Sequence, residues 1–159
     1  MANPTYMDGQ TEIQWEMRRT LVDWLLQVHL RYHMLPETLW IAVNIVDRFL
    51  SKRVVSLVKL QLVGLTAMFI AAKYEEIMAP SVDEFVFMAE AGYTREEILK
   101  GERIILTVSP KFPDDVPQLT PPFRPSSSKF HPIAHRTAGS EGSVKPTITT
   151  FKHELYASF

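Results

Sequence analysis

Few residues in this sequence have the types and spacing that metal binding requires. His29 and His33 are four residues apart, which places two imidazoles on one face of a helix and can hold a metal ion. No Glu follows His29 in the pattern of zinc proteases, so we interpret the pair as a polar helix surface near a loop. His131 and His135 share the spacing but lie in a Pro- and Ser-rich segment, which makes them no better candidates.

Other catalytic constellations are also missing from the sequence. It contains no Cys and no Gly-rich phosphate loop, since Gly64 stands alone in an apolar segment. The adjacent acids Glu75 and Glu76, and likewise Glu96 and Glu97, diverge on a helix, so we expect them on solvated faces. Because no nucleophile, base and orienting group come together, we predict a protein that is not an enzyme and binds no metal or cofactor.

Two charged residues are placed where apolar neighbours would bury them. On a helix Arg18 shares a stripe with Trp15 and Val22, and Asp47 lies among apolar residues such as Val46 and Phe49. A buried charge is costly unless it is paired and hydrogen-bonded. We therefore predict a buried and, if geometry allows, bidentate ion pair between Arg18 and Asp47. The alternative is that each charge reaches water separately.

Lys73 and Glu102 form a second set of charges beside apolar residues. By helical spacing Ile70, Lys73 and Tyr74 share one face, and Glu102 shares another with Leu106. Charges set among apolar residues are typical of a protein-binding surface. An internal ion pair between Lys73 and Glu102 is the alternative, and we favour the binding surface.

The overall composition limits the classes of partner. The 159 residues include 46% hydrophobic residues and carry a net charge of −1, with acids and bases mixed along the chain. A nucleic-acid binder or a binder of anionic membranes would show a basic patch, so we expect neither partner. The longest apolar run, from Leu62 to Ala72, is shorter than the roughly 18 residues of a membrane span, so we expect a soluble protein.

These residues must be positioned by helices, because the apolar spacing is helical and no segment alternates as a strand does. Thr11 is a plausible N-cap of the first helix, Ser81 of the fourth, and Thr94 with Glu97 forms a capping box for the fifth. Pro36 suits the first turn of the second. The expected helices are Glu12 to His33, Glu37 to Ser51, Leu57 to Ile77, Val82 to Ala89 and Thr94 to Thr107, with the third at the centre.

The composition changes at residue 108. Of the 11 prolines only Pro4, Pro36 and Pro80 come earlier, and the others fall between Pro110 and Pro146. Proline removes a backbone donor and breaks helices, so we predict a disordered Pro/Ser-rich tail. The expected organisation is a lead-in over residues 1–11, one all-α five-helix domain over 12–107, and the tail over 108–159.

Several segments of the helical region resemble a known family when they are taken together. MRRTLVDWL from Met17, LPETL from Leu35, VDRFL from Val46, KLQL from Lys59 and AAKYEE from Ala71 follow one another in the order and spacing of a cyclin N-terminal box. Tyr6-Met7, EIQW from Glu12 and PSVDE from Pro80 are similar in particular to B-type, G2/mitotic cyclins. The resemblance covers residues 3–107.

The resemblance implies a regulatory subunit that binds and activates a cyclin-dependent serine/threonine kinase at the G2/M transition, in the nucleus and cytoplasm. The five residues that define the box fall on Arg18, Asp47, Leu62, Lys73 and Glu102. Lys73 and Glu102 resemble the residues that hydrogen-bond the kinase. The apolar contacts of its mobile C-helix would be Ile70, Tyr74 and Leu106.

A second surface follows from the same resemblance. The stripe of Met17, Leu21 and Trp24, with Gln27 and Gln61, is similar to the patch that docks Arg-x-Leu peptides of substrates and inhibitors. Arg19 and Thr20 stand where Ala and Ile are usual, and Gln27 replaces an acid found in some cyclins. These changes should weaken such docking, and core packing is an equally good interpretation of the stripe.

The sequence departs from the family after Thr107. From this comparison we expect neither the second box of mitotic cyclins nor the upstream destruction motif. Val108-Ser109 is what the splice-donor hexamers GTAAGT and GTGAGT encode in frame, so our hypothesis is a translated intron or misjudged gene structure over 108–159. Two alternatives stay open. One is a non-activating fragment that only docks peptides or binds kinase weakly. The other is a transcription-factor type of cyclin fold, which 11 basic against 13 acidic residues over 12–107 disfavours.

Overall fold

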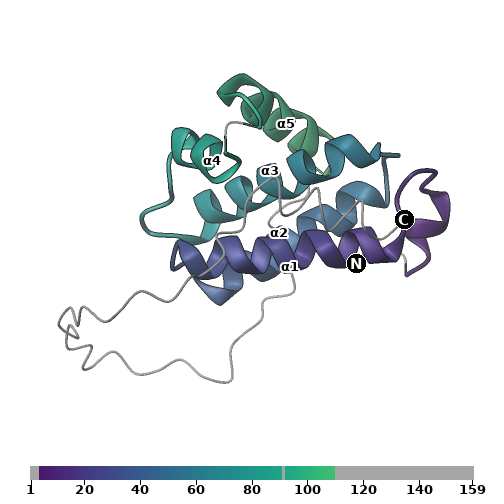
Figure 1. Cartoon of the computed structure of the whole chain (residues 1–159), viewed down its shortest axis with the longest axis horizontal. Coiled ribbons are helices and arrows are strands. Elements are labelled where there is room, and N and C mark those ends of the chain that lie inside the picture. The colour runs from purple at the N-terminus through teal and green to yellow at the C-terminus, as the bar shows by residue number, and fades with distance from the viewer. Residues whose placement is uncertain (1–3, 91, 110–159) are drawn as a thin grey trace.

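The computed structural model describes residues 4–90 and 92–109, and within them every regular element is a helix. Figure 1 shows α3 across the middle, with α1 and α2 on one side of it and α4 and α5 on the other. The five-helix, all-α prediction is confirmed for this part of the chain. In order, the elements are the short 3-10 helix η1 (Tyr6–Gly9), α1 (Trp15–Arg31), α2 (Pro36–Leu50), α3 (Leu57–Glu75), α4 (Val82–Met88) and α5 (Arg95–Val108).

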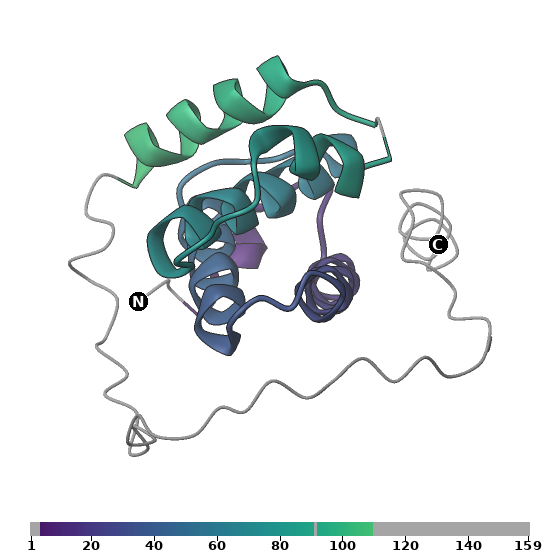
Figure 2. The same ribbon diagram turned by 90° about the vertical axis from the view of Figure 1, so that its left-hand side faces the viewer.

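Helix α3 is the centre of the core, as its apolar sequence predicts. Every residue from Val63 to Ala72 is buried, and α3 packs against each of the other four helices (Figure 2). By length and composition alone α3 could cross a membrane, but 61% of its apolar window is buried inside the fold. A helix that is apolar all round is explained by neighbours that cover it on all sides.

Two close helix contacts depend on glycine. A Cβ at Gly64 would lie 2.6 Å from Leu21 Cδ1, and a Cβ at Gly101 would lie 2.9 Å from Thr66 Oγ1. A larger residue at either position would therefore force the Leu21 or the Thr66 side chain to move in a packed interior.

The ends of the helices largely follow the predicted signals. Ser81 caps α4 by accepting a hydrogen bond from the Glu84 N–H, and Thr94 caps α5 by accepting one from Glu97 N–H, each as part of a capping box. Pro36 occupies the first turn of α2. Helix α5 runs one residue past the predicted end, to Val108, whose carbonyl accepts a hydrogen bond from Lys52 Nζ at 3.1 Å.

The first helix begins later than predicted. It starts at Trp15 with Gln14 as N-cap, so the predicted start at Glu12 and the Thr11 cap are wrong. The reason is that side chains of the lead-in bind the α2–α3 connection instead. The Gln10 amide donates to the carbonyls of Leu50 and Arg53, both at 2.7 Å, and accepts from the Val55 N–H at 3.0 Å.

Helix α3 ends at Glu75 rather than at Ile77, because Glu76 turns away to bind α2. Its Oε1 accepts hydrogen bonds from Leu35 N–H at 2.7 Å and from Thr38 Oγ1 at 2.6 Å. A carboxylate at the start of α2 also suits the positive end of the helix dipole. Glu76 is thus only partly solvated, because its carboxylate is held by α2.

The predicted disordered tail and its His131/His135 pair lie outside the described residues, apart from Val108 and Ser109. Ser109 is buried beside Ile45, Ile70 and Ile105, and its hydroxyl has no hydrogen-bond partner among the described residues.

Candidate functional site

The predicted ion pair between Arg18 on α1 and Asp47 on α2 is present and bidentate. Arg18 Nε donates to Asp47 Oδ1 at 2.6 Å, and Nη2 donates to Oδ2 at 2.7 Å. It is less buried than predicted, since the two side chains keep 23% and 22% of their surface exposed. The reason is that the pair lies at the edge of the α1–α2 contact, where the lead-in covers it only in part.

Tyr6 from η1 is the third member of this cluster. Its hydroxyl donates to Asp47 Oδ1 at 2.6 Å, and its ring meets Trp15 edge-on with centroids 5.4 Å apart. The Arg18 guanidinium carbon lies 5.6 Å from the Trp15 ring centroid. The cluster therefore joins the lead-in to α1 and α2, and sequence reasoning missed it because Tyr6 lies in no periodic segment.

The cluster holds its members in one protonation state. The hydrogen bond to Asp47 raises the pKa of Arg18, against a smaller effect of burial. Burial and then the contacts with Asp47 raise the pKa of Tyr6 above its ordinary value. Arg18 thus stays charged and Tyr6 stays neutral at physiological pH, which is the behaviour of a structural cluster rather than of an acid–base catalyst.

Lys73 on α3 and Glu102 on α5 contact each other directly through Lys73 Nζ and Glu102 Oε1. The Lys73 ammonium also lies 4.4 Å from the Phe69 ring centroid. In the free chain Lys73 and Glu102 therefore form the internal pair that was our alternative, and the binding surface that we favoured stays a prediction. Lys73 still exposes 45% of its side chain, whereas Glu102 exposes 14%.

The apolar residues predicted with this pair lie around it to different depths. Tyr74 and Leu106 are exposed, whereas Ile70 is buried. Ile70 and Leu106 line the same small cleft between α3 and α5. The two helix faces predicted separately thus join into one surface, which we call the α3–α5 surface: Ile70, Lys73, Tyr74, Glu102 and Leu106.

The stripe predicted to dock peptides is largely closed in the free chain. Met17, Leu21 and Trp24 of α1 and Gln61 of α3 are buried, whereas Gln27 is exposed. Gln61 Oε1 accepts a long hydrogen bond from the Tyr93 hydroxyl at 3.5 Å, but its Nε2 is buried with no acceptor among the described residues. The stripe is therefore core in this state, with one polar group left unsatisfied.

The two members of the His29/His33 pair lie in different environments. His29 is buried, contrary to the predicted surface position, and neither ring nitrogen has a partner within the described part of the chain. His33 is exposed in a left-handed turn with φ of 51°. Among residues 4–90 and 92–109, no three His, Cys, Asp or Glu side chains are placed to share a metal ion.

The chain was compared with known proteins. Residues 1–108 match the family described as "Cyclin, N-terminal domain". The G2/mitotic-specific cyclin cdc13 of Schizosaccharomyces pombe is 64% identical over 108 residues, which are 68% of this chain and 22% of that protein. The G2/mitotic-specific cyclin-4 of Saccharomyces cerevisiae is 53% identical over 104 residues, 65% of this chain and 23% of that protein.

A solved structure shares the fold. The viral cyclin of herpesvirus saimiri superimposes with a TM-score of 0.63 at 22% identity, over 66% of this chain and 46% of the viral one. This likeness concerns the fold alone. The chain spans less than a quarter of the length of the two yeast relatives named above.

Proposed function

The chain belongs to the cyclin family, in which the matched segment is the N-terminal domain, and from this premise we propose that it binds a cyclin-dependent kinase and regulates it at the G2/M transition. The relatives that carry the names of G2/mitotic-specific cyclins support the timing. Members of this family are regulatory subunits rather than enzymes, which agrees with a helical fold organised around packing.

The α3–α5 surface is the observation that carries the proposal. It combines a half-exposed lysine with the exposed apolar side chains of Tyr74 and Leu106. An ammonium has three donors, and Glu102 accepts from one of them, so Lys73 can donate to a partner without leaving its internal pair. A helix of the kinase that packs on Tyr74 and Leu106 would bring its backbone carbonyls to Lys73.

The mechanism that we propose is a shift of population. A kinase that samples an inward and an outward position of its C-helix is activated by a partner that binds only the inward position. In the inward position the kinase forms its own Lys–Glu ion pair, which phosphoryl transfer needs. The cyclin contributes a rigid surface for this, because Ile70 and Phe69 beneath it belong to the buried core.

Binding of Arg-x-Leu peptides is a second proposed role, supported by the unsatisfied Gln61 amide. A buried donor without an acceptor costs free energy, and a peptide carbonyl could satisfy it. The stripe of Met17, Leu21 and Trp24 would have to open first, because these residues are buried in the free chain.

The test is capture of purified cyclin-dependent kinase by the full 159-residue chain, followed by a histone-kinase assay. Tyr74→Ala and Leu106→Ala should each weaken capture by about tenfold, as loss of an apolar anchor does. Trp40→Ala removes an even more exposed aromatic residue from α2 and should leave capture unchanged.

Two outcomes would redirect the proposal. Capture without an increase in histone phosphorylation would indicate a cyclin box that binds kinase but does not activate it. Equal losses for Trp40→Ala and Leu106→Ala would mean that the α3–α5 surface is not the kinase site.

A further inference from the structure

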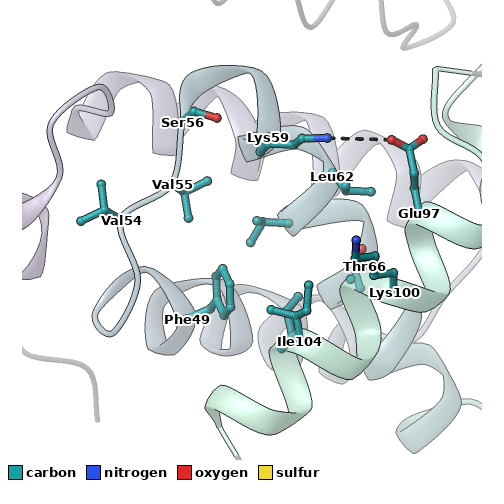
Figure 3. A pocket seen from close by; sticks show the side chains of 13 residues that line it. Phe49, Val54, Val55, Ser56, Lys59, Leu62, Thr66, Glu97, Lys100 and Ile104 are labelled. Atoms are coloured by element: carbon teal, nitrogen blue, oxygen red, sulfur yellow. Dashed lines mark ion pairs between the residues drawn. The ribbon is translucent and has the colours of Figure 1, made fainter.

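A pocket of about 460 Å³ opens between α5, the first half of α3 and the α2–α3 connection. Figure 3 shows it from close by, with Phe49 and Ile104 at the bottom of the view. Val54 and Val55 lie to the left, and Leu62 lies at the upper right. Its volume is within the range of about 300–1,000 Å³ that is typical of ligand pockets. None of the residues assigned to the kinase or to Arg-x-Leu peptides lines it.

The walls of the pocket are apolar and its rim is cationic. Lys59 and Lys100 are the basic residues of the lining, and Glu97 is its single acid. Glu97 is already engaged, because it accepts from the Thr94 N–H of the α5 capping box and lies 3.8 Å from Lys59 (Figure 3). The rim therefore carries a net positive charge, and no acid among the described residues pairs with Lys100.

One buried polar group lines the pocket without a partner. Thr66 is fully buried, and its hydroxyl has no hydrogen-bond partner among the described residues. It lies directly beneath Gly101, where a Cβ would be only 2.9 Å from the oxygen. Buried hydroxyls normally have a hydrogen-bond partner. An unsatisfied hydroxyl in a pocket therefore indicates that a ligand supplies the partner.

This pocket is separate from the α3–α5 surface. Thr66 and Lys73 both lie on α3, and Lys73 is two turns further along, about 10 Å at the rise of a helix. Exposed apolar residues continue from the pocket to the outside at Val54 and Ile104. A ligand that enters here would leave Lys73, Tyr74 and Leu106 free for another partner.

We propose that this pocket is a docking site for a partner peptide that carries a large apolar or aromatic side chain beside acidic residues. The apolar side chain fills the space between Phe49, Leu62 and Ile104. The peptide backbone satisfies the Thr66 hydroxyl, and its acids lie against Lys59 and Lys100. The cationic rim selects an acidic peptide over a basic one, and the proposal does not depend on kinase binding.

The experiment titrates the full isotope-labelled chain with the acetylated peptide Asp-Asp-Phe-Asp-Asp and follows backbone amide shifts by NMR. The largest shift changes are expected at Thr66 and Gly101. The peptide Asp-Asp-Ala-Asp-Asp should bind about tenfold more weakly, because it lacks the apolar anchor. Lys-Lys-Phe-Lys-Lys should bind at least about tenfold more weakly, because its charge is repelled by the rim.

Variants then locate the site. Ile104→Glu and the double variant Lys59→Glu/Lys100→Glu should each weaken binding by about tenfold. Thr66→Val keeps the shape but removes the hydroxyl, for an expected loss of about three- to tenfold. Val58→Glu is the matched control, since Val58 on α3 is as exposed as Val54 and more exposed than Ile104 but does not line the pocket. If Ile104→Glu melts early by circular dichroism, Val54→Glu replaces it.

Three results would overturn the proposal. Equal affinity for the Phe and Ala peptides would show that no apolar anchor contributes to binding. Shift changes centred on Met17 and Trp24 would place the peptide outside the pocket. Loss of binding in Val58→Glu equal to that in Ile104→Glu would mean general charge repulsion rather than a site.

Discussion

Two of the ion pairs in the described part of the chain look alike in sequence and differ in structure. Arg18–Asp47 is bidentate, is joined by the Tyr6 hydroxyl and exposes less than a quarter of either side chain. Lys73–Glu102 has a single contact and leaves almost half of the lysine exposed. A charge that is held in two hydrogen bonds and mostly covered by the fold serves stability, whereas one that is half exposed is suited to a partner.

The largest effect that the comparison predicts is on stability at the first pair. Asp47→Ala leaves Arg18 and the Tyr6 hydroxyl without their acceptor, and we expect a loss of about 2–4 kcal/mol in the free energy of unfolding. Urea denaturation followed by circular dichroism measures it. Asp23→Ala removes an exposed acid from α1 as a control and should change little.

A double-mutant cycle makes this prediction specific. Arg18→Met and Asp47→Ala should show a coupling of at least about 1 kcal/mol. Additive losses would mean that packing, not the ion pair, accounts for the effect.

The next effect concerns binding at the second pair. Lys73→Ala should weaken kinase binding by about 2 kcal/mol, as truncation of a desolvated interface charge does. It should lower the stability of the free chain by less than about 1 kcal/mol, because the pair is partly exposed to solvent. Surface plasmon resonance and urea denaturation separate the two effects, with Arg19→Ala as an exposed control on α1. A large loss of stability with unchanged kinase affinity would make Lys73 a structural residue like Arg18.

These two predictions also indicate how far the sequence alone could lead. Helix order, the capping boxes and the Arg18–Asp47 pair were all predictable, because each has a periodic or local signal. Tyr6, Gln10 and Glu76 were not, since their hydrogen bonds join residues about 40 positions apart and leave no periodicity. For Lys73 and Glu102 helical spacing gave two separate faces, and only the crossing of α3 and α5 brings them together.

A smaller effect on stability is expected at alkaline pH, because only the Arg18–Asp47 pair is hydrogen-bonded to a tyrosine hydroxyl. The pKa of Tyr6 is raised by burial and by Asp47, so its stabilising effect is complete below about pH 10, the ordinary tyrosine value. Above that pH the unfolded phenol ionises first, and stability should fall by at most about 1.4 kcal/mol per pH unit. Tyr6→Phe should reduce this fall, as measured by urea denaturation at a series of pH values, whereas Glu102→Ala should not.

Tyr93 gives the reference for that experiment. Burial, with the nearby Glu97 charge, raises its pKa to about 12, so its own contribution is lost between about pH 10 and pH 12. Tyr93→Phe should remove the loss of stability that Tyr93 causes between about pH 10 and pH 12. A Tyr6→Phe variant with an unchanged alkaline profile would show that the Tyr6–Asp47 hydrogen bond contributes nothing to stability.

The smallest expected difference is in the response to salt. The coupling between Lys73 and Glu102 should fall by about 0.5 kcal/mol between 0.1 and 1 M NaCl, because salt screens exposed charges. The coupling between Arg18 and Asp47 should change less. Double-mutant cycles at both salt concentrations measure this, and equal responses would remove the distinction between the two pairs.

The triple contact of Gln10 has a consequence for local opening of the fold. The Val55 amide belongs to an irregular connection, yet its hydrogen is bonded to Gln10 Oε1 and should exchange with solvent slowly. When the lead-in detaches, this amide loses its acceptor, and so the exchange rate of Val55 reports detachment of a segment 45 residues earlier in the chain. Because Val55 is also part of the pocket wall, a ligand held in the pocket should slow exchange at Val55 and so hold the lead-in in place.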